Sequence, residues 1–216
     1  MPRPTWDNLD AQRRERVLHA AMAEFGSRGY SGGSLNVIAR EAGVAKGSLF
    51  QYFNDKFDFF AHVAEQTSLT IYSAMSPHLS GPQAGESFVD YFTRLVQAWM
   101  SYMADHPLER SVTAATNLEL DPQVRQAIRE PVHRLYTLAL RPMIAEGIRA
   151  GELRADTDVD ALLAMLILLL PHLAMAPFEP GLDAALPLFA TDAATRGQRA
   201  QRLIATVLAS SSVVSR

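Results

Sequence analysis

Hydrophobic residues recur along this chain at intervals of three and four positions, the spacing that places them on one face of an α-helix. The clearest pattern runs from Phe88 to Met103. Alternation typical of strands is nearly absent, so the pattern predicts an all-α protein. We expect helices over residues 13–28, 35–42, 45–53, from Asn54 or Asp55 to just before Pro77, 86–104, 108–120, 122–150, 159–170 and 193–209.

Glycine, proline and capping residues predict where these helices end. A group of glycines is expected to end the first helix: Gly26, Gly29, Gly32 and Gly33. Ser34 is a good N-cap for the second helix, and Gly43 can adopt the left-handed conformation that stops it. Pro131 and Pro142 are expected to kink or divide the long helix that begins at Pro122.

The composition is that of an ordinary globular protein, with 48% hydrophobic and 20% charged residues. The absence of cysteine excludes disulfides, thiolate zinc sites, iron–sulfur clusters and cysteine nucleophiles. The start of the chain lacks the apolar stretch of a signal peptide. The longest apolar run, residues 161–171, is short of the roughly 20 residues that a membrane span needs. We therefore expect a soluble cytoplasmic protein with no membrane partner.

Residues 34–56 place a short helix, a glycine-containing turn and a second short helix within about twenty positions, an arrangement typical of a helix-turn-helix. Ala39 is small enough for the two helices to approach, and Val44 can fill the space between them. Gly47 inside a helix costs about 1 kcal/mol relative to alanine. This cost is easier to understand if the missing side chain lets the backbone approach a DNA duplex.

This segment resembles the N-terminal DNA-binding domain of the tetracycline-repressor (TetR) family of bacterial transcriptional regulators. The resemblance spans residues 13–60 and rests on Ala20-Ala21, Phe25, Gly29, Ile38-Ala39, Ala42-Gly43-Val44, Gly47-Ser48-Leu49-Phe50, Tyr52-Phe53 and Lys56. It implies a three-helix helix-turn-helix DNA-binding domain over residues 1–55. A larger all-helical domain over residues 56–216 would then dimerise and bind a small effector.

By the same resemblance, a group of residues is expected to contact double-stranded DNA: Ser34, Asn36, Lys46, Gly47, Ser48, Phe50, Tyr52 and Lys56. Base-edge chemistry makes Lys46 a candidate for reading guanine and the neighbouring Gln51 a candidate for adenine. Two positions depart from the family pattern. Phe50 replaces the usual tyrosine, which removes a hydroxyl, and Ala45 replaces a serine or threonine that would cap the second helix.

Charge is distributed unevenly along the chain, whose formal net charge is -3. Residues 1–60 hold 8 lysines and arginines against 7 acidic residues, whereas residues 61–216 hold 12 against 16. The only two lysines, Lys46 and Lys56, lie in the helix-turn-helix segment. The more basic end of the chain is therefore the end that carries the DNA-binding pattern.

The helix predicted over residues 159–170 is apolar on every face except Asp160. One face packs on the protein's own core, so the second would be exposed on a monomer and is expected to bind a second copy. The last helix supplies another apolar stripe, and two such pairs would form a four-helix bundle. The predicted homodimer interface comprises Leu162, Leu166, Leu169, Leu203 and Val207. A two-fold dimer predicts an operator that is an inverted repeat.

Methionine and aromatic residues of the larger domain could line a pocket for a small apolar effector, although core packing uses the same residue types. The candidates are Trp99, Met103, Tyr136, Met143, Met165 and His172. His172 could equally be a core histidine.

An alternative hypothesis is an all-helical enzyme or small-molecule carrier with a helix-turn-helix-like N-terminus. The sequence offers no nucleophile arrangement or phosphate loop for such an enzyme, and His133 and Glu130 are neighbours on one helix turn. The six histidines lack the paired spacing of metal ligands. We therefore expect no catalytic residues, no metal site and no cofactor.

Overall fold

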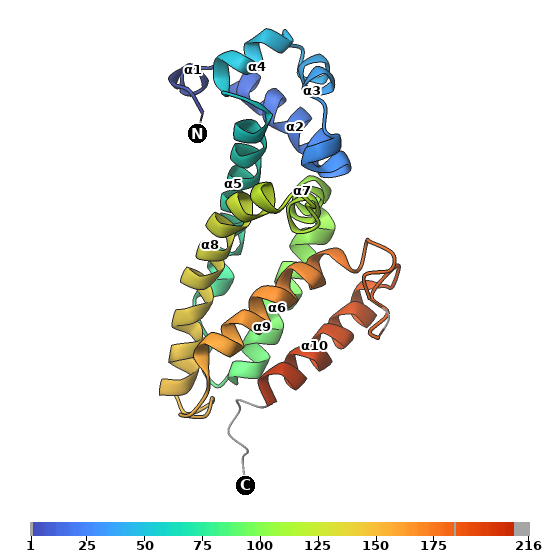
Figure 1. Ribbon diagram of the computed structural model, residues 1–216. Helices are drawn as coiled ribbons and strands as arrows, with labels where there is room; N and C mark the ends of the chain where they lie inside the picture. Colours follow the sequence, from blue (N-terminus) through green and yellow to red (C-terminus); the bar gives the residue numbers. More distant parts are fainter. Residues whose placement is uncertain (1, 184, 210–216) are drawn as a thin grey trace. The chain divides into compact units, whose positions relative to one another are not determined.

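The computed structural model describes residues 2–183 and 185–209, in which the regular structure is helical and no β-strand occurs, so the all-α prediction is confirmed (Figure 1). The helices are α1 Pro4–Asp7, α2 Ala11–Gly32, α3 Leu35–Glu41, α4 Lys46–Tyr52, α5 Lys56–Met75, the 3-10 helix η1 Ser76–Leu79, α6 Phe88–Asp105, α7 Pro107–Asn117, α8 Pro122–Arg149, α9 Val159–Met175 and α10 Ala193–Ala209. Each predicted helix corresponds to one of these, and α1 and η1 are additions. None of the described helices has the length and hydrophobicity to cross a membrane.

The chain divides into two compact units. The first unit comprises Met1–Ile71 and His106–Val132, and the second comprises Tyr72–Asp105 and His133–Arg216. The helices α5 and α8 each contribute residues to both units. The functional boundary between residues 55 and 56 stays a prediction.

The core of the first unit is built from the apolar faces of α2 to α5, with α1 and α7 packed against them. Its fully buried aromatic and aliphatic side chains include Phe25, Ile38, Leu49, Phe53, Phe59 and Phe60. The helices α2 and α7 approach closely at Gly26, where a Cβ atom would lie 2.1 Å from the Ser111 hydroxyl oxygen. Gly26 therefore serves helix packing and does not end α2. The break falls at Gly29, whose φ of 66° interrupts a helix that continues to Gly32.

In the second unit, α6 buries one face against α9 and α10. The Trp99 indole donates a hydrogen bond of 3.0 Å to the Leu170 carbonyl, which joins α6 to α9. Of the two effects expected of Pro131 and Pro142, a kink or a division, the division does not occur, because α8 is continuous from Pro122 to Arg149. Each proline removes one backbone donor, and the neighbouring hydrogen bonds of a long helix maintain it.

Candidate nucleic-acid interface

The segment from α3 to α4 forms the helix-turn-helix that its sequence predicts. Gly43 makes the turn with a φ of 66°, which favours glycine because side chains with a Cβ atom are strained there. The Val44 amide donates to the Ala39 carbonyl at 2.9 Å and closes the turn. Ile38 and Ala39 of α3 are buried beneath it. The turn therefore fixes α4 against the core through backbone bonds and apolar contacts.

The start of α3 departs from the prediction. Ser34 precedes the helix, but its hydroxyl makes no capping hydrogen bond. Its backbone amide instead donates to the Glu24 carboxylate at 2.9 Å, which ties the start of α3 to α2. Asn36, in the first turn of α3, is exposed and available to a partner.

The helix α4 has one buried face and one exposed face. Leu49 is buried in the core, whereas Lys46, Gly47 and Gln51 are exposed and Ser48 is half-buried. A Cβ atom at Gly47 would meet no protein atom within 4 Å. The packing of this unit therefore does not require a glycine there, and the backbone of α4 is accessible at this point.

Two aromatic residues of α4 lie in different environments. Phe50 is 41% exposed and lies on the same side of the helix as Lys46 and Gly47. Tyr52 is only 5% exposed, and its ring centroid lies 5.7 Å from that of Trp6. The structure thus corrects the assignment of Tyr52 to the DNA-facing surface, because three positions after Leu49 its side chain shares the buried face.

Lys56 is the first residue of α5 and is half-buried beside the end of α2. Its ammonium group donates to the Ser31 carbonyl at 3.2 Å and lies 4.9 Å from the centroid of the Tyr30 ring. Burial raises the pKa of the Tyr30 hydroxyl, and the Asp55, Asp121 and Glu119 carboxylates raise it further. The Tyr30 ring therefore stays uncharged and is a suitable support for the Lys56 cation.

Sequence reasoning missed two buried residues that support this surface. Glu119 accepts hydrogen bonds from the Tyr30 amide at 3.2 Å and from the Asp121 amide at 3.0 Å. It thereby supplies a partner for a backbone donor next to the break at Gly29. Trp6 of α1 is 2% exposed and packs against the end of α4. Both contacts join residues far apart in the sequence, and no periodic pattern reveals them.

The residues predicted to bind an effector divide into separate groups in the second unit. Trp99 and Tyr136 contact each other edge to face, with ring centroids 6.2 Å apart. Met103 is fully buried and His172 is half-buried. Met165 is 47% exposed on α9, so its assignment to an enclosed pocket is corrected.

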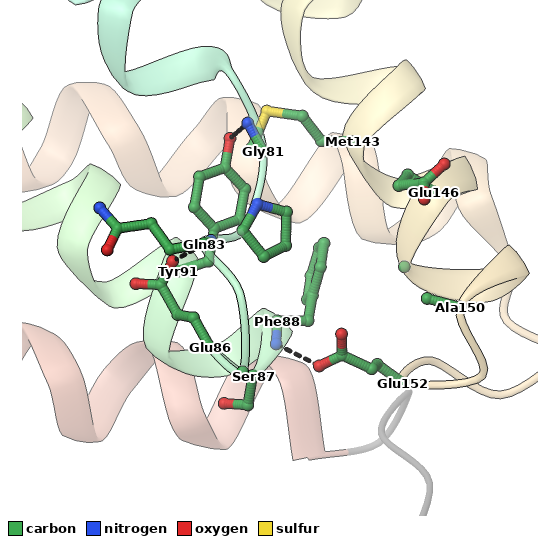
Figure 2. A pocket seen from close by; sticks show the side chains of 13 residues that line it. Gly81, Gln83, Glu86, Ser87, Phe88, Tyr91, Met143, Glu146, Ala150 and Glu152 are labelled. Carbon is green, nitrogen blue, oxygen red and sulfur yellow. Dashed lines mark hydrogen bonds between the residues drawn. The ribbon is translucent and has the colours of Figure 1, made fainter.

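A pocket of about 550 Å³ lies in the second unit between the segment before α6 and the end of α8 (Figure 2). Its lining includes the apolar side chains of Pro82, Phe88, Tyr91 and Met143, and the acidic side chains of Glu86, Glu146 and Glu152. Of the predicted effector residues, only Met143 belongs to this lining. The predicted effector residues are spread over the second half of α6, α8 and α9, whereas this pocket lies at the first turn of α6 and the end of α8.

The acidic side chains of this pocket already have partners. Arg94 donates two hydrogen bonds of 2.8 Å to Glu86, and together with the Gln83 amide these lower the pKa of Glu86 to about 2. Glu152 accepts a hydrogen bond from the Phe88 amide, drawn as a dashed line in Figure 2. Because these carboxylates hold the segment before α6 in place, the pocket offers a ligand mainly its apolar surface.

The helix α9 has the second apolar face that its sequence predicts, but on different residues. Leu162 and Leu166 are buried within the protomer's own core, so they leave no surface for a partner. Met165 and Leu168 are exposed by 47% and 73%, and Leu169 is half-buried. On α10, Leu203 and Val207 are half-buried at the edge of the face that packs on α6.

Within the described ranges, no group of three or more histidine, aspartate or glutamate side chains is arranged to hold a metal ion.

Comparison with known proteins gives matches over both parts of the chain. Residues 17–63 match the family model described as bacterial regulatory proteins, tetR family. Residues 89–177 match the model of the tetracyclin repressor-like C-terminal domain.

Curated relatives and solved structures agree with these matches. The fatty acid metabolism regulator protein of Bacillus subtilis is 26% identical over 67% of this chain and 72% of its own length. The transcriptional repressor AcnR of Corynebacterium glutamicum is 23% identical over 85% of each chain. The structure of Bacillus subtilis FadR in complex with stearoyl-CoA has a TM-score of 0.72, with 19% identity over 88% of this chain and 96% of that one. A TetR family regulator from Chloroflexus aurantiacus has a TM-score of 0.62, with 23% identity over 97% and 95%.

Proposed function

Because the chain belongs to the TetR family of bacterial transcriptional regulators, we propose that it is a repressor which binds an inverted-repeat operator as a homodimer and leaves it when a small apolar effector binds. The observation that carries this proposal is the exposed face of α4. Lys46, Gly47 and Gln51 lie on it, and the opposite face is fixed in the core. Such a helix can enter the major groove without loss of its own packing.

Each polar residue of the proposed DNA-binding surface has a proposed role that follows from its chemistry. Lys46 donates to guanine in the major groove, and Gln51 pairs with adenine through its amide. Asn36, Ser34 and Ser48 lie near the starts of α3 and α4, where short polar side chains contact the DNA backbone. Lys56 contributes a phosphate contact, which affects all sequences alike.

The effector is proposed to be a small molecule with an apolar portion. The pocket lined by Phe88, Tyr91 and Met143 and the Trp99–Tyr136 pair supply apolar surfaces of the kind that binds such ligands. The relative FadR, solved in complex with stearoyl-CoA, supports an effector of this class. Since its proposed partner is chromosomal DNA, we place the protein in the cytoplasm.

The proposal is tested by selecting bound DNA from a random pool with the full-length protein, followed by titration of the selected and a scrambled duplex. We expect an inverted repeat to be enriched. Lys46→Ala should weaken binding to the selected duplex by about 1 to 3 kcal/mol and leave the scrambled duplex nearly unaffected. Lys56→Ala should weaken binding to both duplexes and reduce the salt dependence by about one unit for each half-site.

Arg149→Ala serves as the control, because it removes one exposed positive charge from the second unit. It should bind like the wild type. Failure of the wild type to enrich any sequence would reject the proposed function, and equal losses on both duplexes for Lys46→Ala would reject its role in base reading.

A further inference from the structure

The N-terminal segment of the chain lies against the C-terminal end of α4. The Arg3 amide donates to the Tyr52 carbonyl at 2.8 Å, and the Thr5 hydroxyl donates to the Gln51 carbonyl. The Arg3 guanidinium donates through Nε to Asn54 at 3.1 Å. Residues 3–5 therefore contact three positions at the end of the helix proposed to read DNA.

These contacts supply hydrogen-bond donors to carbonyl groups at the end of α4. The last carbonyl groups of any α-helix lack partners within the helix. The helix α4 has only 7 residues, and short helices depend on packing and caps for their stability. It ends in an extended Phe53, which supplies one hydrogen bond back to Leu49. The N-terminal segment thus donates hydrogen bonds to two further carbonyl groups of the last turn, those of Gln51 and Tyr52.

Trp6 anchors the segment in place. Its ring centroid lies 5.0 Å from that of Phe53 and 5.5 Å from that of His62 in α5. On the other side, the Arg14 guanidinium donates to the Asp7 carbonyl at 2.8 Å and lies 5.9 Å from the Trp6 ring. The helix α1 is therefore held against α2, α4 and α5 at once.

We propose that residues 3–6 are part of the DNA-binding surface, with Trp6 as a positioning residue for α4 and Arg3 as a DNA phosphate contact. This inference rests on the proposed DNA binding. Arg3 is exposed, and within the described residues its two Nη groups make no hydrogen bond. The bond to Asn54 holds this cation just beyond the C-terminal end of α4, where we expect the phosphate backbone of a duplex bound to α4 to pass.

The test measures how affinity for the selected operator depends on salt, using the full-length protein. Arg3→Ala should weaken binding and reduce the salt dependence by about one unit for each half-site, whereas Arg3→Lys should keep most of that dependence. Arg149→Ala, which removes the same charge from the second unit, should match the wild type.

Trp6 is tested in parallel. Trp6→Ala should reduce operator affinity by about tenfold with an unchanged salt dependence, because it removes packing and no charge. Trp6→Phe retains an aromatic ring and should recover most of the affinity, which a variant that simply unfolds could not do. If the wild type binds the operator and Arg3→Ala binds it with the same affinity and the same salt dependence, the inference is overturned and the proposed function stays intact. Absence of wild-type binding would instead reject the proposed function.

Discussion

At the scale of single residues, Gly47 is a position where folding stability favours one residue and the proposed DNA binding favours another. No protein atom lies within 4 Å of the place where its Cβ would be. Its backbone is helical, and alanine is intrinsically better than glycine in a helix. The folded protein alone would therefore be more stable with alanine, so the glycine is best explained by an approaching partner.

We predict that Gly47→Ala raises the free energy of unfolding by about 0.5 kcal/mol and weakens operator binding. The stability change is measured by denaturant titration and the binding change by titration of the selected duplex. Gly26→Ala is the contrasting variant, since its new methyl group would meet Ser111 and should destabilise the protein. Undiminished operator binding by Gly47→Ala would mean that DNA does not approach α4 at this residue.

The sequence predicts the exposed residues of α4 better than the buried ones that hold it. Lys46 and Gln51 are exposed as their polar character indicates. The family resemblance placed Tyr52 among the residues expected to contact DNA, yet its ring packs against that of Trp6, which lies 46 positions earlier in the chain. Glu119 reaches Tyr30 across 89 positions. Such contacts depend on tertiary packing, which a local pattern does not encode.

At the scale of elements, the sequence pattern predicts the helix α9 but not which of its residues are buried. The sequence correctly predicts a helix that is apolar all round, but it cannot say which face meets its neighbours. The structure turns Leu162 and Leu166 toward the protomer's core and leaves Met165 and Leu168 at the surface. The choice follows from where α6 and α10 pack, and that arrangement depends on the whole unit.

The helix α5 carries a buried histidine whose ionisation affects stability. His62 is buried between Trp6 and Phe53. Burial lowers its pKa below the ordinary value of 6.5, although the carboxylates of Glu65, Asp58 and Asp7 act in the opposite direction. The unfolded chain therefore takes up this proton at a higher pH than the folded chain does.

The free energy of unfolding is consequently expected to fall as the pH drops below about 6.5. His62 contributes at most about 1.4 kcal/mol per pH unit to this fall. Above that pH the histidine is neutral in both states and contributes no penalty. Denaturant titrations of wild type and His62→Phe at pH 7.5 and 5.5 measure the effect, and the variant should lose part of the pH dependence. His19→Gln, at an exposed position of α2, should retain it. An unchanged pH dependence in His62→Phe would exclude His62 as its source.

At the scale of the whole molecule, the proposed operator symmetry requires two copies of α4, and the exposed face of α9 is the surface proposed to join them. Met165 and Leu168 lie one turn apart on this face, and Leu169 borders it. Exposed apolar side chains grouped in this way are uncommon on a monomer. Leu203 and Val207 of α10 add half-buried apolar surface in the same unit.

We predict that the double variant Met165→Asp and Leu168→Asp dissociates the dimer at micromolar concentration, as measured by light scattering, and reduces operator binding. Both residues are exposed, so each protomer should keep its helical circular dichroism spectrum and stay folded. Leu138→Asp on α8 is the matched control, because this leucine is 64% exposed and lies outside the α9 face. Leu166→Asp would be uninformative, since this residue is fully buried and a charge there would unfold the unit. A double variant that remains dimeric and binds the inverted repeat would place the dimer contact on another surface.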